Sequence, residues 1–437
     1  MTGPTLSAIS APATAPARVS GAWATALLAL VAFLAAMHQN VLSILLVPVQ
    51  HDLQLSDAAM GALAGTAFAI VYGLASLPLA RLADRGNRRN LLVAALGVWS
   101  VATALCGLAA NVFHLLVARI GVAGALAAQP PATFSMVGDL APPARRGAAI
   151  SVVVFGNSLG FGVGAYVTGL LNDHYGWRLT MALLAAPGLL MAPLLLMTLR
   201  EPARVQDAAE SSTPVGMIEG FRQIAGVRTF WPLLAGFVIL NVAYSGFLAW
   251  MPAFLMRVHG LSTTNMGAAF GLVTVCGAVS NVAGGPLTDR LAGRRQRWRL
   301  YYCAVTAVLS APLLAAGLLV GALPLALAGI AGFALVSGGL TTVCTAAFLA
   351  ISPARLRGQV IAVMNLGVFL VAGGLAPPLF GLATDALKGA YGEGALRYGL
   401  QLAPAAVLIA AALFWLASRT CDGDAIDTID HAERSTP

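Results

Sequence analysis

Long stretches of apolar residues alternate with short polar segments along the whole chain of 437 residues. A helix needs about 20 apolar residues to cross the roughly 30 Å core of a bilayer. Stretches of about this length cover residues 23–48, 58–80, 91–110, 113–137, 147–171, 177–199, 230–256, 265–288, 299–321, 323–350, 358–383 and 396–418. Strands of a transmembrane barrel would instead alternate in polarity over about ten residues. The pattern therefore predicts an all-α polytopic membrane protein with twelve transmembrane helices.

Composition agrees with a chain that lies mostly in lipid. Hydrophobic residues make up 59% of it and charged residues 10%, with a mean hydropathy of +0.83. Soluble domains carry about 25% charged residues, so a soluble fold of this length would lack surface charge. The five cysteines show no CxxC spacing, and we expect neither a disulfide nor a metal site.

Basic residues gather in alternate polar segments, and cytoplasmic loops carry an excess of Lys and Arg. With the N-terminus inside, the cytoplasmic segments hold most of the 25 basic residues. The opposite side holds Arg178, Arg257, Lys388 and Arg397. Both termini are therefore expected in the cytoplasm. The net charge of +8 then reflects topology and contact with anionic lipid, and it gives no reason to expect nucleic acid as a partner.

The longest internal polar segment, residues 200–229, divides the predicted helices six and six. Within it, apolar residues recur over Val215–Arg228 at helical spacing, which predicts a short helix on the cytoplasmic face. The Pro-, Ala-, Thr- and Ser-rich start precedes the first apolar stretch, so we expect a disordered tail rather than a cleavable signal. The expected units are a tail (1–22), a first half (23–199), a linker (200–229), a second half (230–418) and a second tail (419–437).

The two halves repeat each other. Ala80–Arg89 reads ARLADRGNRR, and Gly285–Arg295 reads GPLTDRLAGRR. At nearly the same separation, Asn172-Asp173 ends the fifth apolar stretch and Thr384-Asp385 ends the eleventh. Repeated helical halves are typical of secondary transporters, whose substrate site lies near mid-membrane between the repeats.

The doubled Asp-Arg…Arg-Arg loops resemble the signature loop of the major facilitator superfamily. Within that superfamily the sequence is most similar to the bacterial Spinster-like branch. The residues that carry this second resemblance are Leu42–Leu45, Ala83–Arg89, Pro130-Pro131, Asp139, Pro142-Pro143, Arg145-Arg146, Gly176–Arg178, Leu199–Pro202, Trp250–Leu255 and His259-Gly260. The resemblance implies a monomeric secondary transporter of the bacterial inner membrane, without a cofactor, that moves a small organic solute by alternating access.

The repeated loops predict a conformational latch on the cytoplasmic face. Charge clusters there can join the halves in the outward-open state and separate in the inward-open one. The residues of the expected latch are Asp84, Arg85, Arg88, Arg89, Asp289, Arg290 and Arg294. The alternative is that these charges only fix topology.

Glycines at four-residue spacing allow helix backbones to approach closely. They occur as Gly61-xxx-Gly65, Gly156-xxx-Gly160-xxx-Gly164 and Gly267-xxx-Gly271. The resemblance implies that helices 2, 5, 8 and 11 face the seam between the halves, so these glycines are expected there. Ordinary tight packing within one half is the alternative.

Polar residues inside predicted spans are candidates for the substrate and coupling site. His38, Gln39 and Asn40 lie mid-helix in the first span, and we expect His38 and Gln39 to face the cavity. Arg119 is a basic residue that lies well inside a span, at a depth similar to that of His38. No acidic residue lies at that depth, and a buried cation needs a neutralising partner. An organic anion, or an amphiphile with an anionic head, would supply one; alternatively, backbone carbonyls bind Arg119 or its side chain reaches toward the interface.

In the second half, Asn241, Tyr244 and Ser245 lie at i, i+3 and i+4 on one face of the seventh span. A polar face of this kind predicts cavity lining.

The resemblance also marks a departure. Spinster-like proteins carry acids in helices 1 and 4 that are linked to proton coupling. The matching positions here read His38-Gln39 and Gly124-Ala125-Leu126. His38 has a suitable ordinary pKa, yet a histidine held neutral would only be a hydrogen-bonding ligand, so a coupling ion stays open.

The sequence bears on four other functions. The chain has no Gly-Lys-Ser/Thr phosphate loop and no grouped nucleophile, base or metal ligands, so neither a pump driven by nucleotide hydrolysis nor an enzyme is expected. A sensor that binds solute without moving it is one alternative. An organic-anion symporter of the hexuronate or phthalate type is the other.

Replacing Asp84 with Asn should slow transport without preventing membrane insertion, because the change removes the carboxylate of the expected latch. Solute counterflow in proteoliposomes measures the rate, and the amount of protein in the vesicles measures insertion. An unchanged rate would contradict the latch.

Overall fold

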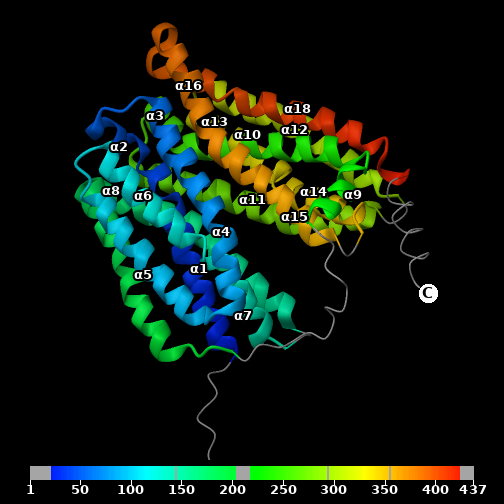
Figure 1. Cartoon of the computed structure of the whole chain (residues 1–437). Coiled ribbons are helices and arrows are strands. Elements are labelled where there is room, and N and C mark those ends of the chain that lie inside the picture. The colour runs from blue at the N-terminus through cyan, green and yellow to red at the C-terminus, as the bar shows by residue number, and fades with distance from the viewer. Residues whose placement is uncertain (1–20, 143–144, 203–216, 293–294, 354–355, 424–437) are drawn as a thin grey trace, which may run out of the picture.

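The computed structural model describes residues 21–142, 145–202, 217–292, 295–353 and 356–423 (Figure 1). Residues 1–20 and 424–437 of the expected tails, residues 203–216 of the expected linker and Arg294 lie outside these residues. In the first half, the helices are α1 (Gly21–Ile44), α2 (Leu46–Leu53), α3 (Asp57–Gly61), the π-helical turn η1 (Ala62–Thr66), α4 (Ala67–Arg85), α5 (Arg88–Gly107), α6 (Val112–Leu126), α7 (Gln129–Leu140) and α8 (Arg146–Thr198).

The second half repeats this arrangement after a linker helix, α9 (Met217–Ala225). Its helices are α10 (Phe230–His259), α11 (Thr263–Ala292), α12 (Arg297–Leu319), α13 (Leu323–Ser337), α14 (Leu340–Ala350), α15 (Arg357–Gly367), the π-helical turn η4 (Val368–Gly373), α16 (Gly374–Tyr391), the 3₁₀ turn η5 (Gly392–Gly394), α17 (Ala395–Gly399) and α18 (Leu402–Ser418). Every predicted span falls on a helix, and the all-α membrane fold is confirmed.

Two stretches each hold two spans. Ten stretches in the described residues are long and apolar enough to cross a membrane, and two of them have 53 and 62 residues. A straight helix of the length of α8 would extend about 80 Å, more than twice the bilayer core. The helix instead bends at Gly176, where φ is 73° and ψ is 164°. This backbone conformation favours glycine, so that glycine separates spans five and six.

Spans four and ten are interrupted at matching positions. α6 ends at Leu126 before Pro130-Pro131 in α7, and α13 ends at Ser337 before Gly338-Gly339. Interrupted helices at corresponding places in two repeats are the best sequence-level pointer to a transporter's binding site. The breaks therefore make spans four and ten candidates for the lining of a binding site.

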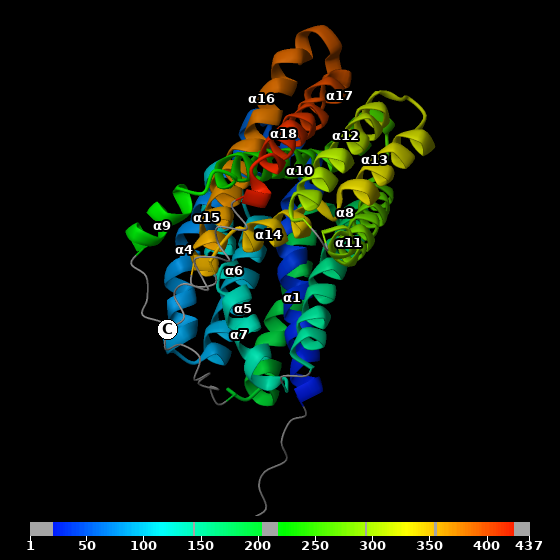
Figure 2. The same cartoon turned by 90° about the vertical axis from the view of Figure 1, so that its right-hand side faces the viewer.

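The halves meet along two seams, α3–η1 against η4–α16 and α8 against α11 (Figures 1 and 2). A Cβ added at Gly61 would lie 2.5 Å from the carbonyl oxygen of Pro377. One added at Gly267 would lie 2.5 Å from the carbonyl oxygen of Ala165. Glycine thus lets backbones of opposite halves touch, as expected for helices 2 and 8.

The expectation for the glycines of helix 5 is wrong. Gly156, Gly160 and Gly164 pack against α1 within their own half. The same helix meets α11 through Gly162, whose added Cβ would lie 3.5 Å from Gly271. A helix turns about 100° per residue, so the two glycine sets lie on different faces, and sequence spacing alone does not tell which face meets which neighbour.

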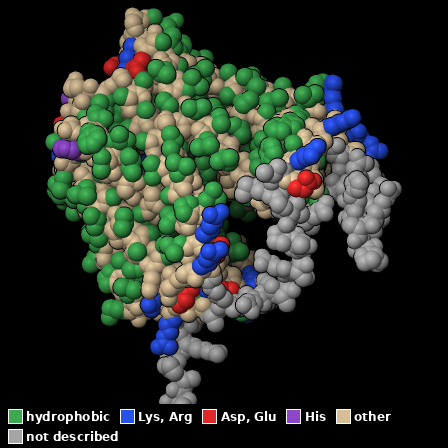
Figure 3. All heavy atoms as spheres, in the orientation of Figure 1, with side chains coloured by type: hydrophobic (Ala, Val, Ile, Leu, Met, Phe, Trp, Pro, Cys, Tyr) green, Lys and Arg blue, Asp and Glu red, His purple; other side chains and the backbone are tan. Residues whose placement is uncertain are grey.

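The halves join at one end and separate at the other. We call the joined end, which holds the α2–α3 and α10–α11 connections, the closed end. The opposite end, which holds Gly21 and Ser418, is the open end. Hydrogen bonds and ion pairs join the halves near the closed end. Among the described residues, the bond from Thr66 to Gly374 is the one farthest from that end. Figure 3 shows the notch that separates the halves beyond this point.

Gly61→Ala should destabilise the protein by about 1–3 kcal/mol, because the new methyl group overpacks a backbone–backbone contact. Gly73→Ala in α4 is the matched control, since a Cβ there meets nothing within 4 Å. Alanine also favours a helix over glycine, so this control should be neutral or stabilising. Thermal unfolding of both purified variants measures the difference, and equal midpoints would contradict the packing argument.

Candidate substrate site and closed-end gate

Arg119 lies in α6 with 2% of its surface exposed. Its Nη1 is 3.5 Å from the carbonyl oxygen of His38, and its guanidinium lies 4.9 Å from the centroid of the Phe68 ring. Its Nε has no hydrogen-bond partner in the described structure. No carboxylate of the described residues lies within ion-pair distance of it. The result is a buried cation with a weak carbonyl contact, an aromatic face and a free donor.

His38 is buried within the first half, with 1% of its surface exposed. Its Nδ1 lies 2.7 Å from the carbonyl oxygen of Leu34, and its ring centroid is 6.4 Å from that of Trp99 in α5. His38 therefore packs within the first half in this conformation, and its place at a substrate site stays a prediction. Gln39, the next residue, is exposed, and Asn40 is half-buried with an unbonded Nδ2. His38 and Arg119 nevertheless lie close together, because the side chain of Arg119 contacts the backbone carbonyl of His38.

Two of the three polar side chains on this face of the seventh span already make hydrogen bonds within the protein. Asn241 donates to the carbonyl oxygen of Phe237 on its own helix at 2.8 Å. The hydroxyl of Tyr244 donates to the carbonyl oxygen of Ser337 at 2.6 Å, at the break in span ten. Ser245 is half-buried. Tyr244 therefore joins the seventh span to the interrupted helix.

Of the predicted latch residues, Arg88 and Arg89 contact groups of their own half in this conformation. Arg88 is buried in its own half, where its Nε donates to Glu201 at 2.7 Å and its Nη1 donates to Asp139. The backbone N–H of Arg89 donates to the same Glu201 at 2.8 Å. The remaining described side chains of the set are exposed, namely Asp84, Arg85 and Arg290. The side chain of Asp289 and all of Arg294 lie outside the described residues, so the latch stays a prediction.

A buried ion-pair cluster, which the sequence reasoning missed, closes the opposite end. Asp57 is fully buried, and Nη1 of Arg257 contacts its two carboxylate oxygens at 2.9 and 3.1 Å. Lys388 lies 2.9 Å from Asp57, and Gln50 donates to it at 2.6 Å. Asp57 and Gln50 belong to the first half, whereas both cations belong to the second. These contacts hold the halves together.

Two more carboxylates cap helices across the seams. Asp385 accepts hydrogen bonds from the backbone N–H groups of Asp57 and Ala58 at 3.3 and 2.8 Å. Asp173 accepts from those of Thr263 and Thr264 at 3.2 and 2.8 Å. Each capping carboxylate therefore meets the positive N-terminal end of a helix from the other half. The Asn172-Asp173 and Thr384-Asp385 repeat was the sequence signal for this gate.

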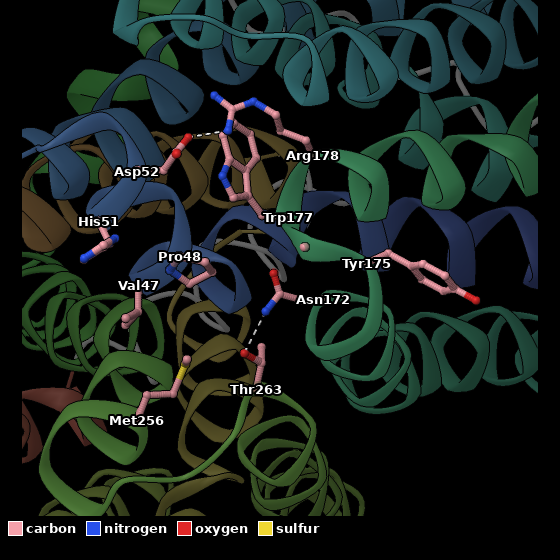
Figure 4. Close-up of a pocket in the computed structure, with 11 residues that line it drawn as sticks. Val47, Pro48, His51, Asp52, Asn172, Tyr175, Trp177, Arg178, Met256 and Thr263 are labelled. Atoms are coloured by element: carbon pink, nitrogen blue, oxygen red, sulfur yellow. Dashed lines mark hydrogen bonds and ion pairs between the residues drawn. The ribbon is translucent and has the colours of Figure 1, made fainter.

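A pocket of about 630 Å³ opens at the closed end, between α2, the bend of α8 and the α10–α11 connection (Figure 4). Asp52 and Arg178 form an ion pair in its wall, with the guanidinium 4.3 Å from the Trp177 ring. Because these charges neutralise each other, the pocket offers no free charge to an anion. Within the described part of the chain, no three His, Cys, Asp or Glu side chains are placed to bind a metal.

Asp57→Asn should loosen the closed end, because it leaves Arg257 and Lys388 without their buried carboxylate. We expect a cost of about 2–3 kcal/mol, below that of a fully buried pair because Lys388 is 39% exposed. Spin labels at positions 51 and 393, which are exposed on opposite halves, should then show a longer distance.

Asp52→Asn is the control for this measurement. Its pair with Arg178 lies within one half and is 40–45% exposed, so its loss should cost about 0–1 kcal/mol. Equal label distances in the two variants would contradict a gate at Asp57.

Comparison with known proteins gives a consistent assignment. A family model described as Major Facilitator Superfamily matches residues 28–377. The chain is 31% identical over 425 residues to an MFS-type efflux pump of Mycolicibacterium smegmatis, covering 93% of this chain and 95% of the pump. A hexuronate transporter of Bacillus subtilis is 26% identical over 258 residues, which are 58% of this chain and 61% of that protein.

Among solved structures, a bacterial homolog of the human lysosomal transporter Spinster, in an inward-facing and unoccupied conformation, matches with a TM-score of 0.82. It is 27% identical, and the match covers 92% of this chain and 98% of that one. The predicted resemblance to the Spinster-like branch is confirmed, and these homologues are transporters rather than enzymes. Twelve spans in two repeated halves, joined at one end and matched over nearly the whole chain, place this protein in the Major Facilitator Superfamily.

Proposed function

We propose that this transporter carries organic anions, with Arg119 as the group that neutralises the substrate's negative charge. The supporting observation is that Arg119 is buried without a carboxylate partner in the described structure and keeps an unbonded Nε. A lone cation in a low-dielectric interior is costly unless an anion pairs with it. A substrate carboxylate would provide charge-assisted hydrogen bonds, which are stronger than neutral ones.

The proposed orientation has both termini in the cytoplasm of a bacterium, with the chain in the plasma membrane. Arginines gather in the loops of the open end, in line with the positive-inside tendency. Exposed tryptophans also gather there: Trp23, Trp231, Trp298 and Trp415. Indole rings favour the membrane interface. The structure is then inward-open, with the Asp57 gate closed toward the outside.

The proposed cycle is alternating access by rocking of the halves. Opening outward requires the capping bonds of Asp173 and Asp385 and the pairs of Asp57 to break. Closing the cytoplasmic side would assemble the latch around Asp84. The protein would act as a monomer, since each half supplies the other's gate.

The mycobacterial relative is an efflux pump, which is a likeness to an exporter. The likeness to the hexuronate transporter supports the alternative of an organic-anion symporter. Symport with protons needs a titrating group, and His38, the candidate of the first half, is buried against Trp99. This burial favours anion transport without a proton carried by His38. A sensor that binds solute without moving it would show binding but no counterflow.

Arg119→Gln should lower the affinity for the carried anion by about 10- to 100-fold, because it removes a charge-assisted hydrogen bond worth about 1.5–3 kcal/mol. A panel of short carboxylates and lysolipids, tested first for binding and then for counterflow in proteoliposomes, identifies the anion and checks the effect.

Arg397→Gln is the matched control, since the Nη1 of Arg397 also donates to a backbone carbonyl, that of Leu319, at 3.1 Å. That arginine is partly exposed and far along the chain from α6. If both variants bound the anion like the wild type, the proposal would fail.

A further inference from the structure

Three aromatic rings form a stack that begins above the buried arginine and ends in the other half. Phe68, whose ring faces Arg119, lies 5.8 Å from Tyr72 between centroids, at an angle of 20°. Tyr72 lies 4.9 Å from Phe369, at 30°. Phe68 and Tyr72 belong to α4 of the first half, and Phe369 belongs to η4 of the second. The Tyr72–Phe369 contact therefore crosses the seam.

Local backbone chemistry explains why Phe369 reaches this position. Pro377 and Pro378 have no N–H groups, so the carbonyls of Gly373 and Gly374, four residues earlier, lose their helical donors. The chain adopts the π-helical turn η4 there, and the hydroxyl of Thr66 donates to the carbonyl oxygen of Gly374 at 2.5 Å. Thr66 is the last residue of the other π-helical turn, η1. Such turns recur at functional sites, and this pair brings the aromatic residues of both halves together.

The stack also lies near the middle of the membrane, at the depth where a substrate would bind. Phe68 is eleven residues from the start of α3 at Asp57, which corresponds to about 16 Å along the helix. This is about half of a bilayer core of roughly 30 Å. Substrates of repeat-built transporters bind near this depth, between the halves. Phe68 is 8% exposed and Tyr72 is half-buried, and Phe369 covers Tyr72 in this conformation.

Rocking of the halves moves Phe369 relative to Tyr72. When η4 and α16 withdraw from η1 and α4, they expose a flat aromatic surface next to Arg119. A flat ring with a carboxylate would complement both features at once. The ring would replace Phe369 against Tyr72, and the carboxylate would reach the free donor of Arg119 beside Phe68.

We infer that the carried anion is a planar aromatic carboxylate, recognised by Tyr72 and Phe68 through stacking and by Arg119 through charge. This inference rests on the proposed function, because it names the substrate class of the same site. Tyr72 is then a specificity-determining residue. Aromatic stacking adds to the affinity given by buried area, and its usual size corresponds to a preference of about 3- to 10-fold.

Benzoate and cyclohexanecarboxylate test this inference, since they have similar size and the same charge but only benzoate is planar. Their affinities for the purified full-length protein in lipid nanodiscs are measured by calorimetry. We expect benzoate to bind about 3- to 10-fold more tightly. Tyr72→Leu should abolish this preference, whereas Tyr72→Phe, which keeps the ring, should retain it.

Tyr301→Leu is the matched control. Tyr301 is half-buried and packs on the ring of Trp298 at 5.7 Å, in α12 away from the seam. This variant should keep the preference for benzoate, and it also reports the general cost of removing such a tyrosine.

Two results would overturn the inference. Equal affinities of the wild type for both acids, each lost in Arg119→Gln, would reject the aromatic substrate class and leave the proposed anion transport intact. Binding of lysolipids with no detectable binding of either acid would also reject it. A preference for benzoate that survives both Tyr72→Leu and Arg119→Gln would assign the binding to another site.

Discussion

The seam between the halves depends on backbone contacts that glycine makes possible. At Gly61 and Gly267, a single methyl group would come within 2.5 Å of a carbonyl oxygen of the opposite half. Contacts this close place helix N-termini within reach of carboxylates from the partner half, which is why Asp173 and Asp385 can cap them. A side chain at either position would push the halves apart and weaken the capping bonds of Asp173 and Asp385 and the Asp57 cluster. Close packing therefore comes first, and the polar gate follows from it.

The gate combines interactions of different strength. An N-cap contributes about 0.5–2 kcal/mol, whereas breaking a buried charge pair costs about 3–5 kcal/mol when one partner stays behind. The α8–α11 seam has a cap and neutral hydrogen bonds, but the α3–α16 seam adds the buried pairs of Asp57. The two seams are thus related by the repeat but differ in energy. Opening the α3–α16 seam requires more compensation, and this is the seam that carries the Phe68–Tyr72–Phe369 stack.

The spans could be predicted from the sequence because each needs only its own composition and length. The burial of Arg119 could also be predicted, because a charged residue inside an apolar stretch can be recognised from the sequence alone. The direction in which a side chain points is different, because it depends on the rotation of the helix against its neighbours. Gln39 follows His38 by one residue, or about 100°, and one is exposed while the other is buried.

The gate was hidden for a related reason. Asp57, Arg257 and Lys388 sit near span ends, where charges are common and usually solvated. Their burial arises from contacts between halves, across roughly 200 to 330 residues of chain, which no local pattern records. The repeat of Asp173 and Asp385 was visible, but its role needed the helix N-termini that they face. Local physics thus predicts the elements, whereas the interfaces between them come from the fold.

The chemistry of the interior is divided between the halves. The first half supplies the buried cation and two of the stacked rings, whereas the second supplies the third ring and the hydroxyl of Tyr244 beside the break in span ten. A substrate that needs both a cation and an aromatic surface would therefore sense the relative position of the halves. Its binding energy can favour one arrangement only by differing between the two. Because Phe369 packs on Tyr72, binding of the proposed substrate there and closure of this seam would be linked.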